Sequence, residues 1–166
     1  VLGSRGLGDV YKRQGLFLKA DITFNTTIAN MNHYKNGAVL SHDRMVRATA
    51  EEIKIMHTKC MGPDDMITSL SGGNQQKVVL ARWLATHPKI LILNGPTVGV
   101  DIGAKYDIHK LLRELAKQGM AVLVVSDDVA EITALCDRAL IMKAGSMTGE
   151  FTGEDLTDDN LYKSTI

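Results

Sequence analysis

Two short apolar runs separated by a helical pattern constrain the fold of this chain more than any other feature. The runs are Ile90–Leu93 and Ala121–Val125, and runs this short are typical of strands buried on both faces of a sheet. The segment between them carries apolar residues at the helical spacing i, i+3, i+4 and i+7: Ile108, Leu111, Leu112 and Leu115. This pattern predicts a helix over residues 104–118, which Gly119 ends. A strand, a helix and a strand at this spacing form a βαβ unit, so we predict an α/β fold with parallel strands.

The other elements are predicted from apolar spacing and from turn residues. They are a helix at 43–57 capped by Ser41, a turn at Gly37, a helix from about Ser71 to before Pro88, a short helix at 129–136, and a hairpin of 139–142 with 147–151. The helix after Ser71 has an expected apolar stripe of Val79, Leu80, Trp83 and Leu84.

Composition excludes several classes of protein. Lys plus Arg and Asp plus Glu both number 19, so no basic surface favours a nucleic-acid partner. The two cysteines, Cys60 and Cys136, have no metal-ligand spacing and are expected to be reduced thiols, with a disulfide as the alternative. The longest apolar stretch, 120–125, is far shorter than the roughly 20 residues that span a bilayer.

The N-terminal residues 1–14 differ in character from the rest of the chain. They resemble the translated read-through of a sequencing adaptor, so we interpret them as non-native, with a flexible natural N-terminus as the alternative. The first residue is Val, and we expect the chain to be a piece of a longer protein.

Ser71, Gly72 and Gly73 open a predicted helix. Two glycines allow the backbone to approach a ligand, and the first-turn N–H groups carry the positive end of the helix dipole. This arrangement suits a phosphate, although a Ser-Gly-Gly helix start can also be an ordinary cap and turn. Asn94 and Gly95 follow the first strand, at the carboxyl end where α/β sheets bind ligands.

Together these motifs resemble a known family. The stretch LSGGNQQKVVLARWLA, the Pro-Thr and Gly-Val-Asp elements after the first strand, and VLVVSDD closely resemble the nucleotide-binding domain of ATP-binding cassette (ABC) transporters. NQQ and GVDIGAK look most like the second cassette of the tandem ATPase subunits of bacterial monosaccharide importers. The resemblance covers about residues 15–155 and implies one partial domain there, with a mostly helical part at 15–86 and an α/β part at 87–155, followed by a tail at 156–166. It implies a partial P-loop NTPase (ABC ATPase) fold, with half of the parallel-sheet core and the α-helical signature subdomain.

The resemblance assigns a nucleotide-binding role to the helix start. Ser71, Gly72 and Gly73 match the signature loop, which in this family contacts the γ-phosphate of ATP held by the opposing cassette. Gln75 lies in the first turn of the same helix, and Asp101 matches the aspartate of the D-loop. These five residues are the expected cofactor-binding residues, with ATP and Mg²⁺ as the cofactors of the intact assembly.

The resemblance also implies that the local catalytic site is degenerate. Asn94 stands where the family has the aspartate that holds Mg²⁺ through water, and Gly95 stands where it has the glutamate that polarises the attacking water. Asp127 occupies the switch position, usually histidine in the family and often serine in this subclass. We therefore expect no intact catalytic residue and no metal ligand here. Substitution by a nearby residue, of which Asp128 is the obvious one, remains the alternative.

No G-x-x-x-x-G-K-[ST] phosphate loop occurs in the sequence. We therefore expect the chain alone to be inactive, and the intact subunit to hydrolyse ATP and drive sugar uptake. The expected partners are the first cassette of the same subunit, a membrane permease and, indirectly, a sugar-binding protein, with the subunit at the cytoplasmic face of the inner membrane. The alternatives are a non-hydrolytic regulatory nucleotide-binding module and a soluble ABC protein of translation or DNA repair.

Overall fold

The computed structural model of the chain describes residues 15–165, which form two compact units. Unit 1 comprises the described residues up to Lys89 together with Thr97–Leu111. Unit 2 comprises Ile90–Pro96 together with the described residues from Leu112 onward. Residues 1–14, predicted to be non-native, lie outside the described residues.

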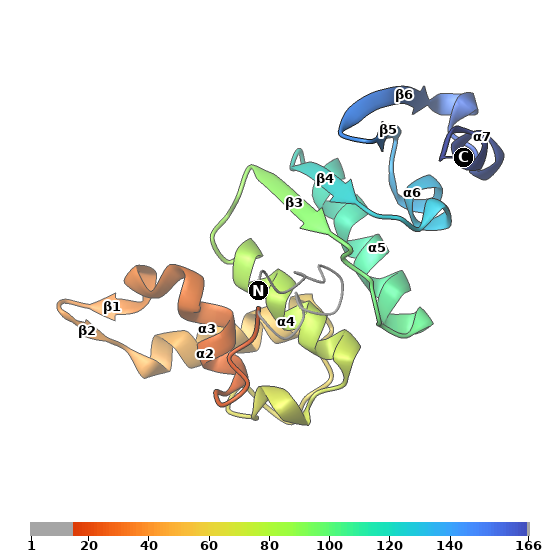
Figure 1. Ribbon diagram of the computed structural model, residues 1–166. Coiled ribbons are helices and arrows are strands. Elements are labelled where there is room, and N and C mark those ends of the chain that lie inside the picture. Colours follow the sequence, from red (N-terminus) through yellow and green to blue (C-terminus); the bar gives the residue numbers. More distant parts are fainter. Residues whose placement is uncertain (1–14, 166) are drawn as a thin grey trace, which may run out of the picture. The chain divides into compact units, whose positions relative to one another are not determined.

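Unit 1 is mostly helical (Figure 1). Its elements are α2 (Ile22–Thr27), the 3₁₀ helix η1 (Ile28–Tyr34), β1 (Lys35–Asn36), β2 (Val39–Leu40), α3 (His42–Ile55), the 3₁₀ helix η2 (Ile67–Ser69), α4 (Gly72–Leu84) and the first part of α5 (Ile102–Lys117). The predicted turn at Gly37 is confirmed, because this residue has a φ of 64° and lies between the antiparallel strands β1 and β2. The helix predicted at 43–57 is confirmed as α3. Ser41 occupies the N-cap position as predicted, but its side chain makes no capping hydrogen bond.

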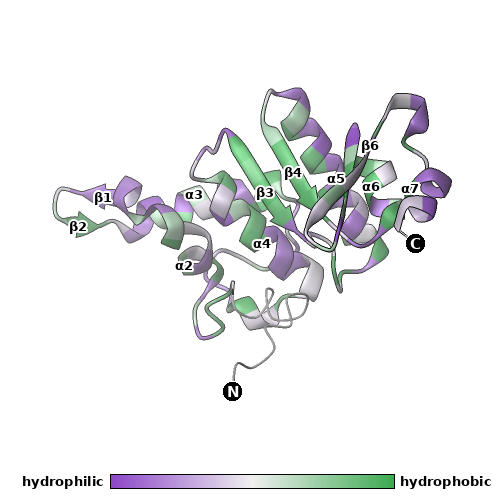
Figure 2. Cartoon of the chain, turned by 45° about the horizontal axis from the view of Figure 1, so that its top comes forward, coloured by the Kyte–Doolittle hydropathy of each residue, from purple (hydrophilic) through white to green (hydrophobic). Residues whose placement is uncertain are grey.

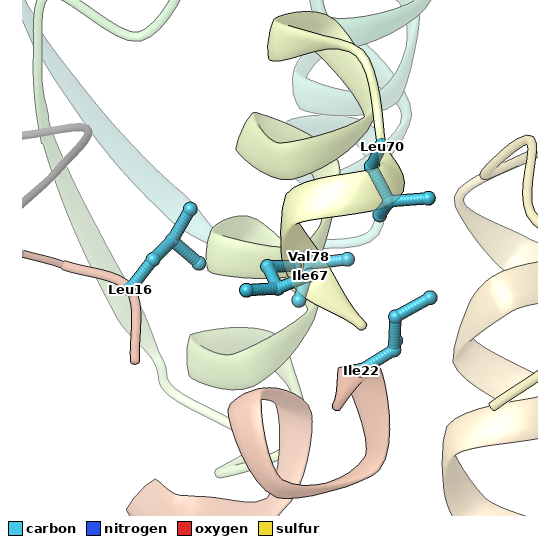
Figure 3. Packing of buried hydrophobic residues seen from close by; sticks show 5 residues of the cluster. All are labelled: Leu16, Ile22, Ile67, Leu70 and Val78. Carbon is cyan, nitrogen blue, oxygen red and sulfur yellow. The ribbon is translucent and has the colours of Figure 1, made fainter. Parts of the chain in front are cut away.

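The core of unit 1 gathers against α4. Figure 3 shows the side chains of Leu16, Ile22, Ile67, Leu70 and Val78 converging from the N-terminal segment, α2, η2 and α4. All five are buried, and burying a side chain of this size contributes about 1.5–3 kcal/mol. Leu70 directly precedes the predicted signature loop, so this core anchors the entry to that loop.

The start and end of α4 agree with the prediction, and Leu80 is buried as expected, but the rest of the predicted stripe is not the buried face. Trp83 was expected in the apolar stripe and is 51% exposed, whereas Val78 and Ala81 are buried. Two charged residues, Lys77 and Arg82, are also buried on this helix. The stripe is rotated because polar partners in unit 1 accept hydrogen bonds from these two side chains, which sequence spacing does not reveal.

Unit 2 carries the predicted βαβ pairing. Its elements are β3 (Ile90–Asn94), the last part of α5, β4 (Ala121–Val125), α6 (Val129–Leu135), β5 (Arg138–Lys143), β6 (Ser146–Thr152), the 3₁₀ helix η3 (Gly153–Asp155) and α7 (Asp158–Thr165). β3 and β4 pair in parallel, with Asn94 opposite Val125 at their carboxyl ends, and β5 and β6 form the predicted hairpin. Gly119, with a φ of 96°, follows α5 as expected. The helix α7 lies where only a tail was predicted.

The two parallel strands are not covered on both faces, which corrects the prediction. Alternate residues along each strand are exposed, including Ile90 (65%), Ile92 (67%) and Leu123 (52%), whereas Leu91 is buried. Figure 2 shows β3 and β4 as strongly hydrophobic elements. One apolar face of this sheet therefore lies open among the described residues.

Both cysteines are free thiols, as expected. Burial is the main cause that raises the pKa of Cys60 and of Cys136, so both are protonated at neutral pH. Among the described helices, none combines the length and apolar character needed to cross a membrane.

Candidate functional site: a signature loop and a carboxyl strand edge

The loop before α4 is held by a dense set of local hydrogen bonds. Ser71 is extended at the N-cap position, and its hydroxyl accepts a bond from the Asn74 side-chain amide at 2.9 Å. The side-chain oxygen of Asn74 accepts from the Lys59 backbone N–H at 2.9 Å. The Gln75 side-chain amide donates to the carbonyls of Ile67 and Leu70, both at 3.2 Å. The conformation of the loop is therefore set before any ligand arrives.

Gly73 lies against the beginning of α5. A β-carbon at this position would be 2.5 Å from the Cβ of Ala104 and 3.3 Å from Oδ2 of Asp101. The other carboxylate oxygen of Asp101 accepts a bond from the Ala104 backbone N–H at 2.9 Å, which caps α5. Unit 1 thus brings the predicted signature loop and the predicted D-loop aspartate together. Only glycine leaves room for this approach.

An ion pair between a buried lysine and a half-exposed aspartate connects the same two helices one turn further along. The Lys77 ammonium donates to Oδ2 of Asp107 at 2.7 Å and to the His57 carbonyl at 3.2 Å. The hydrogen bond from Lys77, followed by the charge of the same ammonium, lowers the pKa of the Asp107 carboxyl against its slight burial. Sequence reasoning missed Lys77 because a lysine in a helix usually faces solvent. Its position four residues after Gly73 could have indicated that Lys77 lies on the same face of α4 as that glycine.

The second group of predicted residues lies at the carboxyl edge of the β3–β4 pair in unit 2. Asn94 is exposed and ends β3. Gly95 has a φ of 56°, and its N–H donates to the Val125 carbonyl at 2.8 Å. Asp127 is exposed two residues after β4 ends. The structure therefore brings Asn94, Gly95 and Asp127 to one sheet edge, as parallel pairing requires.

The turn after β4 is held by a carboxylate that sequence reasoning missed. Glu131 is 1% exposed and accepts a bond from the Ser126 hydroxyl at 2.6 Å. The same hydroxyl accepts from the Asp128 backbone N–H at 3.1 Å. Asp128 caps α6, since its side chain accepts from the Glu131 N–H at 3.1 Å. Asp128, the alternative catalytic carboxylate, therefore already has a structural role.

The two groups of residues differ in the ligand that they fit. At the start of α4, exposed Ser71, the first-turn N–H groups and the helix dipole suit a phosphate oxygen. The β3–β4 edge offers an amide at position 94 and no side chain at position 95. Mg²⁺ is usually bound through one or two carboxylates together with phosphates, so these two positions do not fit a magnesium ion. No group of three or more His, Cys, Asp or Glu side chains that could hold a metal occurs within residues 15–165.

Comparison with known proteins identifies the family. The profile of the ABC transporter family matches residues 6–98, which is more than half of the chain. The chain belongs to the ABC transporter family. The resemblance predicted from the signature loop and the strand motifs is thereby confirmed.

Curated relatives are import ATP-binding proteins. The galactose/methyl galactoside import ATP-binding protein of Treponema pallidum (strain Nichols) is 42% identical over 138 residues, which are 83% of this chain and 28% of the relative. The xylose import ATP-binding protein of Pseudomonas syringae pv. syringae (strain B728a) is 41% identical over 93% of this chain and 30% of the relative. The chain therefore spans less than a third of the length of these curated relatives.

Solved structures confirm the predicted ABC ATPase fold. The dimeric structure of MJ0796, described as a bacterial ABC transporter cassette, matches with a TM-score of 0.70 and 28% identity over 89% of this chain and 62% of that chain. A post-hydrolysis dimer of the same cassette bound to ADP and phosphate matches with a TM-score of 0.68 and 26% identity, over 86% of this chain and 59% of that one.

Proposed function

We propose that this chain is part of the ATP-binding subunit of a carbohydrate importer, in which ATP binding and hydrolysis drive sugar uptake. The observation that carries the proposal is the signature-type helix start, packed against Asp101 as one preformed surface. Support for a sugar as the transported substrate comes from the relatives, which are named for galactose, methyl galactoside and xylose import.

Within that subunit, the cassette presents its signature loop to a nucleotide held elsewhere. Ser71, Gly72 and Gly73 contact the γ-phosphate of an ATP molecule bound by the first cassette, where the helix dipole stabilises the charge. Gln75 fixes the loop through its bonds to two loop carbonyls, and Asp101 lies beside it. Bound ATP with Mg²⁺ supplies the phosphoryl group that water attacks in line. This chain contributes positioning and electrostatic stabilisation.

The local site of this cassette is non-hydrolytic in our proposal. Asn94 brings no negative charge to a metal, and Gly95 supplies no group to polarise a water. Loss of a positioned base typically costs about 10²–10⁴-fold in rate. Asp127 would repel a phosphate, and Asp128 already caps α6. The chain by itself is therefore inactive, because it also has no phosphate-loop motif.

The proposed partners follow from this role. They are the first cassette of the same subunit, a membrane permease, and indirectly a sugar-binding protein, with the subunit held at the cytoplasmic face of the inner membrane. A non-hydrolytic regulatory module is the second candidate function, and Asn94 and Gly95 favour it for the local site alone. The relatives favour the importer over a soluble ABC protein of translation or DNA repair.

The experiment is a charge placed in the loop of the full-length subunit assembled with its permease. Gly72→Asp puts a carboxylate where a γ-phosphate would lie, and we expect ATPase activity and sugar uptake to fall about tenfold or more. The fold should be kept, because an acidic residue at a helix N-terminus is stabilising by about 0.3–1 kcal/mol.

Gly62→Asp is the matched control. It adds the same charge at a position where a β-carbon would meet nothing within 4 Å, so it should leave both activities near wild type. Normal sugar uptake by Gly72→Asp, at wild-type expression, would show that the loop has no role in the nucleotide site.

A further inference from the structure

Two contacts, at different positions along the helices, link α4, which begins at the signature loop, to α5, which begins just after Asp101. The first is the close approach of Gly73 to Ala104. The second is the Lys77–Asp107 ion pair, four residues further along α4 and three residues further along α5. Residues at these spacings lie on one face of a helix, so both contacts lie on the same helix–helix interface. A single contact would let the helices pivot, whereas two contacts one turn apart fix their relative orientation.

The ion pair has the properties of a fixed tether. The Lys77 side chain is only 6% exposed, while that of Asp107 is 48% exposed. A buried ammonium is costly without a partner, and it is held here by one carboxylate and by the His57 carbonyl. By contrast, the Arg138–Glu150 pair is more than half exposed on both sides, at 3.4 Å, and such surface pairs contribute little.

We propose that Lys77 is a positioning residue, which locks the signature loop to the D-loop aspartate Asp101 so that an opposing cassette meets both as one rigid surface. This inference rests on the proposed function. Lys77 does not touch nucleotide in the proposal. It acts through α4 on Gly72 and Gly73, and through α5 on Asp101.

The position of the tether predicts which kinetic constant changes. In the proposed function the nucleotide is held mainly by the first cassette, and the signature loop strengthens its contact as charge develops on the transferring phosphoryl group. A loosened loop therefore loses interactions specific to the transition state, which lowers kcat and leaves KM for ATP nearly unchanged.

The test uses the full-length subunit assembled with its permease, assayed at a temperature where every variant remains folded. Lys77→Met fills the same space without a charge and leaves the half-exposed Asp107 hydrated. Asp107→Asn removes the carboxylate but leaves the ammonium buried. We expect kcat for ATP hydrolysis to fall about tenfold in each, with KM for ATP changed less than about twofold.

Three comparisons make the result specific. The double variant Lys77→Met/Asp107→Asn should be no worse than either single variant, because the pair acts as a unit. Lys77→Arg, which keeps the charge and the donors, should recover part of kcat. Arg138→Met, which breaks the exposed pair, should resemble wild type.

The outcomes separate this inference from the proposed function. If the ion pair had only a structural role, Asp107→Asn would be less stable than Lys77→Met, but kcat of both folded variants would stay at the wild-type value. That result would overturn the inference. A wild-type kcat in Lys77→Met together with inactive Gly72→Asp would refute the tether alone. A fully active Gly72→Asp would instead refute the role of the loop.

Discussion

At the scale of single residues, the backbone conformation of Gly95 restricts which residues can occupy this position. Its φ of 56° is left-handed, a conformation that costs other L-residues about 1–2 kcal/mol. Its N–H donates to the Val125 carbonyl and closes the carboxyl end of the β3–β4 pair. A glutamate at this position could not keep this backbone without strain. In the proposed function, the backbone at Gly95 as well as its missing side chain therefore disfavours a catalytic glutamate at this position.

The strain can be measured as a difference among variants at one site. Gly95→Glu should lower the free energy of unfolding by about 1–2 kcal/mol, while Gly95→Asn should lower it by less, because asparagine tolerates left-handed backbone better. Asn94→Asp should change it by less than about 0.5 kcal/mol, since that side chain is exposed. Urea titrations provide the comparison. Equal stability of Gly95→Glu and Gly95→Asn would argue against a strained glutamate.

Some residues of the candidate site could be predicted from the sequence, and others could not. Ser71, Gly72 and Gly73 were located correctly at a helix start, because turn and cap residues have local signatures. Lys77 was missed because its partner Asp107 lies far along the chain. Glu131 was missed because a charged residue in a short helix is usually exposed, although its partner Ser126 lies nearby in the sequence. Spacing within one helix indicates a face, but it does not identify what packs against that face.

At the scale of elements, strands and helices with strong local patterns were predicted well. β3, α5, β4 and the β5–β6 hairpin lie within two residues of their predicted bounds. α7 was missed, since its eight residues carry one buried apolar side chain, Leu161, and little periodicity. The buried face of α4 was predicted correctly at Leu80 but wrongly at Trp83, because the long-range partners of Arg82 turned the arginine inward.

Arg82 connects α4 to the beginning of the described chain. Its guanidinium donates to the backbone carbonyl and the side-chain oxygen of Asn25, at 2.5 and 3.0 Å, and to the Gly15 carbonyl. It also lies 5.8 Å from the centre of the Phe17 ring. Burial lowers the pKa of this guanidinium, so desolvation offsets part of what these contacts contribute.

Removal of this anchor should destabilise unit 1. We expect Arg82→Met to lower the free energy of unfolding by about 2 kcal/mol or more, because it removes the donor to the Asn25 backbone carbonyl and one of the two donors to the Asn25 side-chain oxygen. Arg82→Lys should fall in between, since an ammonium cannot reproduce the planar fork of donors. Chemical denaturation measures the change, with Arg138→Met as an exposed control expected within about 0.5 kcal/mol of wild type. Arg82→Met as stable as that control would mean that the anchor contributes nothing net.

At the scale of the whole molecule, the open face of the β3–β4 pair is the feature that needs a partner. Parallel strands are usually buried on both faces, yet Ile92 and Leu123 are 67% and 52% exposed. They are paired in register, so they form one continuous apolar strip with Ile90 and Val125. The sequence predicted double burial because apolar residues occupy both faces, but one face of the two strands is exposed among the described residues. In the proposed subunit, other parts of the cassette cover this strip.

A lysine in the strip should therefore have opposite consequences in the two contexts. In the chain alone, Ile92→Lys places a charge in water, so it should change the free energy of unfolding by less than about 0.5 kcal/mol and reduce aggregation. In the full-length subunit the same lysine would be buried without a partner. We therefore expect the free energy of unfolding to fall by several kcal/mol, as buried unpaired charges typically cause, and sugar uptake to be lost. Leu91→Lys, on the face that is already buried, should destabilise both proteins. Thermal unfolding of all variants decides the question. If the full-length subunit tolerates Ile92→Lys as well as the chain alone does, the strip faces water in the assembled protein and the sheet is complete without further strands or helices.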